Sequence, residues 1–159
     1  MGSAALTFVH VIISLFGIFT GLVVMGGILS SNRLPGWTAA FFATTVLTSV
    51  TGYFFHNTHV TPGQIVGAIS LVLLAFALVA FYVFDLRGIW RAVYVVGAVA
   101  SLYLNVFVLV VQSFLKAPAL HALAPKGTEP PFALTQAVVL LSFIILGGFA
   151  LLRFRPAEA

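Results

Sequence analysis

Long runs of apolar residues, separated by short polar or proline-containing segments, dominate the chain. Five such runs occupy about residues 5–29, 37–55, 64–84, 92–114 and 132–152. A helix of about 20 apolar residues is long enough to cross the hydrocarbon core of a bilayer. Backbone in lipid must satisfy its own hydrogen bonds, and the ten-residue alternation of barrel strands is absent. The pattern therefore predicts an all-α, polytopic transmembrane helix bundle of about five spanning helices, forming one integral membrane domain over residues 1–159.

Composition supports this class and excludes others. The chain is 62% hydrophobic and only 6% charged, whereas soluble domains carry about 25% charged residues. It is also too hydrophobic for a disordered protein. The absence of cysteine excludes disulfides, thiolate metal sites and a cysteine nucleophile. The basic residues stand singly or in pairs, so we expect the lipid bilayer, and not nucleic acid, as the first partner.

The basic residues divide unequally between the two sides of this threading. Two fall in the connection after the fourth run, at Lys116 and Lys126. Five fall on the opposite side: Arg33, Arg87, Arg91, Arg153 and Arg155. The positive-inside rule then predicts an outer amino end and a cytoplasmic carboxyl end. Trp37 and Trp90 fall at the proposed cytoplasmic interface, where indole rings prefer to lie. No Lys or Arg precedes the first run, so we expect it to be a retained span and not a cleaved signal peptide.

Small and polar residues inside the runs are candidates for helix packing, because lipid offers no hydrophobic drive to bring helices together. We expect the two amides among them to face the bundle in interhelical hydrogen bonds, and the alternative is a ligand- or ion-orienting role. Packing within the chain, in a homo-oligomer or against a membrane-complex partner all remain open. The candidates are Gly17, Gly21, Thr44, Thr48, Asn105 and Gln136.

The four histidines and one glutamate all fall on the predicted outer side: His10, His56, His59, His121 and Glu129. Imidazole is a common metal ligand, so these residues could form a copper or zinc site with Glu129 as an oxygen donor. Alternatively, His10 and His56 could be the axial ligands of a haem b. The interpretation we favour is structural, with imidazoles that face water or headgroups, or that bond a neighbouring helix.

Two connections add further expectations. The outer connection, about residues 115–131, has Pro118 and Pro125 on either side of a short segment that is expected to lie as an interfacial helix. On the opposite side, Asp85 is expected to balance Arg87 or Arg91, and these arginines could also touch anionic lipid headgroups.

Several stretches resemble a group of small multi-pass inner-membrane proteins of proteobacteria that have no assigned activity. The stretches are residues 33–39, 47–52, 103–107, 118–125 and 129–132. The resemblance implies a location in a bacterial inner membrane. It implies no reaction and no catalytic residues.

Three classes of function remain. Metalloprotease, Walker, nucleophile-elbow and Rossmann motifs are absent, so an enzyme is not expected. The favoured class is a non-enzymatic membrane protein, such as an accessory or assembly subunit of a membrane complex. The second is a redox module that binds a metal or haem at the outer histidines. The third is a small transporter, which the absence of an acidic residue deep in a span disfavours.

Overall fold

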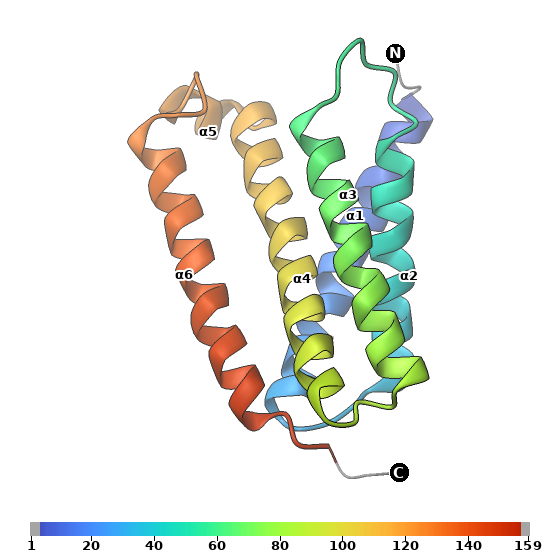
Figure 1. Ribbon diagram of the computed structural model, residues 1–159. Coiled ribbons are helices and arrows are strands. Elements are labelled where there is room, and N and C mark those ends of the chain that lie inside the picture. Colours follow the sequence, from blue (N-terminus) through green and yellow to red (C-terminus); the bar gives the residue numbers. More distant parts are fainter. Residues whose placement is uncertain (1–3, 157–159) are drawn as a thin grey trace.

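The protein is described here by a computed structural model, which covers residues 4–156 and is helical throughout its regular structure. The elements are α1 (Ala4–Leu29), α2 (Pro35–Gly52), α3 (Pro62–Leu78), the π-helical turn η1 (Val79–Val83), α4 (Ile89–Lys116), α5 (Pro118–Leu123) and α6 (Pro130–Arg153). The long helices run alternately up and down, so α1 begins and α6 ends at opposite ends of the bundle (Figure 1). The predicted all-α bundle is confirmed.

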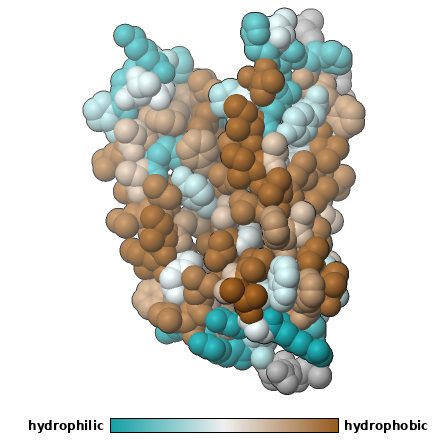
Figure 2. All heavy atoms as spheres, viewed as in Figure 1, coloured by the Kyte–Doolittle hydropathy of each residue, from teal (hydrophilic) through white to brown (hydrophobic). Residues whose placement is uncertain are grey.

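Within the described part of the chain, four helices are long and apolar enough to cross a membrane: α1, the α3–η1 helix, α4 and α6. Hydrophobic residues form a belt between two hydrophilic ends (Figure 2). The protein is therefore a helical membrane protein. The fifth long helix, α2, has 18 residues, six of which are Ser or Thr. It spans about 27 Å at 1.5 Å per residue and lies in the bundle against α1 and α3.

Proline and local capping set the helix boundaries. A proline stands in the first turn of α2, α3, α5 and α6, where its missing N–H costs nothing. The start of α3 has a full capping box, because the Thr61 hydroxyl accepts from Gln64 N and the Gln64 side chain accepts from Thr61 N. The second helix ends at Gly52, three residues before the predicted limit, because the Tyr53 and Phe54 amides bond in a tight turn to Val50 and Thr51.

The core lies in one half of the bundle, near the α1–α2 and α3–α4 loops. Its centre is Tyr94, a fully buried residue whose ring lies 5.2 Å from Phe81, 5.5 Å from Phe154 and 6.3 Å from Phe42. Phe154 follows the last turn of α6 and is also fully buried, which attaches this end of α6 to the core. Along α6 itself, only Ala150 is buried. The sixth helix therefore lies at the edge of the bundle, beside α4 (Figure 1).

Candidate functional site

His10 is held in one orientation between two helices. Its Nδ1 lies 2.8 Å from Thr51 Oγ1 on α2, and its ring meets Phe55 edge-on at 5.2 Å. The Thr51 hydroxyl already donates to Leu47 O at 2.7 Å. Because that proton is committed, His10 Nδ1 must be the donor to Thr51, and the lone pair of a neutral imidazole is then on Nε2. His10 therefore makes the interhelical contact that membrane-embedded polar side chains commonly make.

The other predicted ligands lie in separate places on the same end of the bundle. His56 and His59 are exposed in the α2–α3 loop. His121 lies on α5, the expected short helix after Pro118, and its Nδ1 donates to Phe114 O at 3.2 Å.

Glu129 organises the turn that precedes α6. Its carboxylate accepts from Lys126 N at 2.9 Å and from Thr128 N at 3.0 Å. The hydrogen bond from the Lys126 amide is the main reason why the pKa of Glu129 lies below its usual value. Within residues 4–156, no three His, Asp or Glu side chains are grouped so that they could hold a metal ion. The geometry of these residues therefore gives the copper or zinc hypothesis no support.

The predicted packing glycines lie where helices approach closely. A Cβ added at Gly17 would lie 3.3 Å from Thr44 Oγ1. One added at Gly21 would lie 2.5 Å from a Leu102 methyl group and 2.8 Å from the Phe41 ring. Any side chain larger than that of glycine at position 21 would therefore require Leu102 or Phe41 to shift.

Hydroxyl and amide side chains complete the interior of the bundle. Thr44 and Thr48 donate to carbonyls of their own helix, Ala40 O and Thr44 O. Asn105 Nδ2 donates to Thr45 Oγ1 at 3.2 Å and Gln136 Nε2 donates to Phe107 O at 3.2 Å, so both amides bridge helices.

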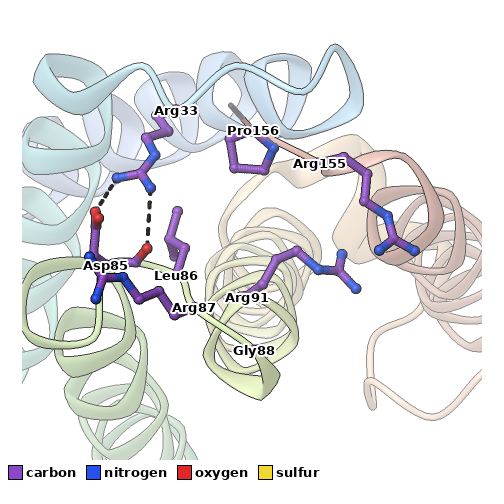
Figure 3. Close-up of a pocket in the computed structure, with 8 residues that line it drawn as sticks. All are labelled: Arg33, Asp85, Leu86, Arg87, Gly88, Arg91, Arg155 and Pro156. Carbon is purple, nitrogen blue, oxygen red and sulfur yellow. Dashed lines mark hydrogen bonds and ion pairs between the residues drawn. The ribbon is translucent and has the colours of Figure 1, made fainter. Parts of the chain in front are cut away.

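The most charged feature is a pocket that we call the arginine pocket. Its volume is about 610 Å³, and three segments build it: the α1–α2 loop, the α3–α4 loop with the start of α4, and the tail after α6 (Figure 3). The residues that line it are Arg33, Asp85, Leu86, Arg87, Gly88, Arg91, Arg155 and Pro156. Four arginines and one aspartate leave an excess of three positive charges.

Asp85 pairs with Arg33, which corrects the expectation that it balances Arg87 or Arg91. Arg33 Nη1 donates to Asp85 Oδ1 at 2.5 Å, and Nη2 donates to the Asp85 carbonyl at 3.2 Å. This hydrogen bond is the first cause of an Asp85 pKa below its usual value, and the charges of Arg33 and Arg87 act in the same direction. The two partners are 52 residues apart, so sequence proximity missed the arginine that bonds Asp85 directly, although the charge of Arg87 also acts on Asp85.

Arg91 closes the carboxyl end of α6. Its Nη1 donates to Leu151 O and Phe154 O, both at 2.9 Å. These carbonyls have no partner inside the helix, and a cation at a helix carboxyl end is favourable. The tail is also tied to the α1–α2 loop, because Arg155 N donates to Ser31 Oγ at 2.7 Å.

Backbone strain concentrates in the two loops of this pocket. Within residues 4–156, the residues other than glycine that have positive φ are Ser31, Leu34, Asp85 and Leu86, at 59°, 40°, 49° and 58°. All four lie in the α1–α2 or α3–α4 loop. Such conformations persist only where the surrounding structure holds them, and they are frequent at functional sites.

Comparisons of the chain with protein-family models, curated proteins and solved structures found no match. Function must therefore be argued from the residues themselves. The sequence analysis used the five arginines to orient the chain and expected Arg87 and Arg91 to balance Asp85 or to touch lipid headgroups. It did not expect four of the arginines to line one pocket. The signal was their location on a single side of the threading.

Proposed function

We propose that the protein is a non-enzymatic, multi-pass accessory or assembly subunit of a bacterial inner-membrane complex. The five long helices would cross the membrane with the amino end outside and the carboxyl end in the cytoplasm. The unequal distribution of basic residues supports this orientation. Four of them line one pocket, and the fifth ends α6 beside it: Arg33, Arg87, Arg91, Arg155 and Arg153.

The exposed face of α6 is the observation that carries the accessory role. Ala133 and Ala137 are four residues apart, and Gly148 follows Ala137 by three helical turns, so the three share one face. All three are exposed. A Cβ at Gly148 would meet no atom within 4 Å. Leu141 and Ile144, which are 58% and 61% exposed, lie on the same face between Ala137 and Gly148. The face is therefore apolar with small residues towards its two ends, where the backbone of another helix can approach closely. The occupant that fits is a transmembrane helix of a partner subunit.

Co-purification from native membranes in a gentle detergent tests this role. Ala137→Leu and Gly148→Leu place bulk on the face, and we expect each to release the partner subunit. Ala75→Leu is the matched control, because Ala75 is an exposed alanine on α3. A single monodisperse species in the unsubstituted protein, or equal loss of the partner in Ala75→Leu, would overturn the proposal. A complex that holds only copies of this chain would replace the partner subunit by a second copy.

A reporter fused to the carboxyl end tests the orientation separately. A reporter active only in the cytoplasm should be active there. Activity of a periplasmic reporter at that position would invert the threading and leave the α6 proposal untouched.

A further inference from the structure

The arginine pocket has cationic groups that the fold does not use. Arg33 is engaged by Asp85, and one nitrogen of Arg91 caps α6. In contrast, the guanidinium groups of Arg87 and Arg155 have no hydrogen-bond or ion-pair partner among residues 4–156, and Arg33 Nε is buried there without one. Figure 3 shows Arg87 beside Asp85, while Arg91 and Arg155 extend to the other side of the pocket. An anion between the arginines would offset their mutual repulsion.

Guanidinium chemistry narrows the class of anion. The planar fork of arginine matches the oxygens of phosphate and carboxylate, and charge-assisted hydrogen bonds of this kind are stronger than neutral ones. Several arginines at once suit a phosphate group, which presents more oxygens and can carry more charge than a carboxylate.

The position of the pocket points to a lipid as the source of the phosphate. Trp90, which directly precedes the lining residue Arg91, stacks on Phe84 at 4.2 Å, and Trp37 is 42% exposed near the start of α2. Indole rings favour the headgroup level of a membrane. Basic pockets between spanning helices are known to hold anionic headgroups.

A separate apolar groove has a lining residue next in sequence to one of the pocket. Gly88 lines the pocket, and the next residue, Ile89, lines a groove of about 370 Å³ between α3 and α4. The other lining residues are Leu73, Phe76, Ala92, Val93, Val96 and Gly97. This groove is almost wholly apolar, as an acyl chain requires. A free phosphate would use the pocket alone, whereas a phospholipid would use both.

We propose that the arginine pocket binds a phosphate group and that the headgroup of an anionic phospholipid presents it. The strained loops support a binding role. Asp85 and Leu86 hold left-handed backbone conformations at the point where the chain must present Arg87 and Gly88 to the pocket. Asp85 then acts as a positioning residue, because its carboxylate holds Arg33 in place and leaves the excess positive charge to the ligand.

Lipid binding to the full chain in nanodiscs of phosphatidylcholine with a minor share of phosphatidylglycerol tests the proposal. The bound phosphatidylglycerol is counted by native mass spectrometry after release into detergent. The pocket variants are Arg87→Gln and Arg155→Gln, whose side chains are exposed, and circular dichroism checks that both remain helical. The matched control is Arg153→Gln, which removes the same charge at the same end. Arg153 does not line the pocket, and its guanidinium lies 5.9 Å from the Phe149 ring centre.

We expect each pocket variant to retain about tenfold less phosphatidylglycerol, which is the effect of losing one charge-assisted hydrogen bond. Arg153→Gln should retain the unsubstituted amount. Arg155→Lys keeps the charge but not the fork, so it should restore binding only in part. An equal loss in Arg153→Gln, or no preference for phosphatidylglycerol in the unsubstituted protein, would overturn the proposal.

A second measurement distinguishes the source of the phosphate. Inorganic phosphate is titrated against chloride at constant ionic strength, and thermal unfolding is followed by tryptophan fluorescence. Protection by millimolar phosphate without any lipid preference would overturn the lipid assignment and make a soluble phosphate the ligand. Lipid preference without protection by inorganic phosphate supports the headgroup assignment and the use of the α3–α4 groove.

Discussion

Close packing at Gly21 makes a quantitative prediction about stability. The substitution Gly21→Ala places a methyl group 2.5 Å from Leu102 Cδ1 and 2.8 Å from the Phe41 ring, and both neighbours are only 1% exposed. Neither can move into open space. Overpacking of this kind costs about 1–3 kcal/mol in the free energy of unfolding. For a chain of this size, that cost corresponds to a fall in Tm of about 2–12 °C.

The same helix offers a matched control and an intermediate case. At Gly26 an added Cβ meets nothing within 4 Å, so Gly26→Ala should gain up to about 1 kcal/mol from reduced backbone entropy. At Gly17 the nearest atom is Thr44 Oγ1 at 3.3 Å, which a small shift can relieve. Thermal unfolding in one detergent, followed by tryptophan fluorescence, should rank the Tm values Gly26→Ala, Gly17→Ala and Gly21→Ala from highest to lowest. A Gly21→Ala protein as stable as Gly26→Ala would refute the reasoning, because it would show that α1 does not approach α2 and α4 closely at this point.

Three further predictions follow from individual contacts. Removal of the Asn105–Thr45 hydrogen bond by Asn105→Leu and Thr45→Val should reveal a coupling of about 0.6 kcal/mol, and no more than about 1.7 kcal/mol, in a double-mutant cycle of unfolding; strictly additive single effects would contradict it. Because the pKa of Asp85 lies below its usual 3.8, its contribution is fully present above pH 3.8 and is lost as the pH falls through the lower folded-state value. The unsubstituted protein should therefore lose more Tm on acidification than Asp85→Asn, and parallel curves would count against the Arg33 pair. Finally, EDTA should change the Tm by less than about 1 °C, because the residues within 4–156 form no group of three metal ligands. A metal bound only to the folded state would stabilise it, so a larger fall in Tm would revive the histidine site.

Sequence alone was sufficient for the helices themselves. The apolar runs predict them because a bilayer imposes length and apolarity on any spanning segment. Pro62 and Pro130 lie in the first turns of α3 and α6, as their positions in the sequence suggest. The least apolar helix, α2, was harder to delimit, since its Ser and Thr side chains weaken the hydropathy signal while their hydroxyls bond the helix's own carbonyls.

Sequence also pointed to the polar groups but not to their partners. The amide of Asn105 is expected to face another helix, but the sequence does not identify its partner Thr45, which is 60 residues away. Sequence proximity suggests Arg87 or Arg91 as the partner of Asp85, whereas the guanidinium that bonds it belongs to Arg33 in a different loop. The sequence also does not predict that α6 lies at the edge of the bundle, because its apolar run is similar to the others.

Hydropathy is a local property that each segment carries with it, so membrane residence and helix existence follow from the chain one stretch at a time. Tertiary contacts depend on how each helix is rotated about its axis and on which helices pack against it. These two properties decide which helices touch, which glycines lie at close approaches and which arginines share a pocket. Small-residue faces allow close approach without specifying the helix that approaches. The arginine pocket is therefore a product of tertiary structure, since it exists only when the α1–α2 loop, the α3–α4 loop and the tail after α6 meet at one end of the bundle.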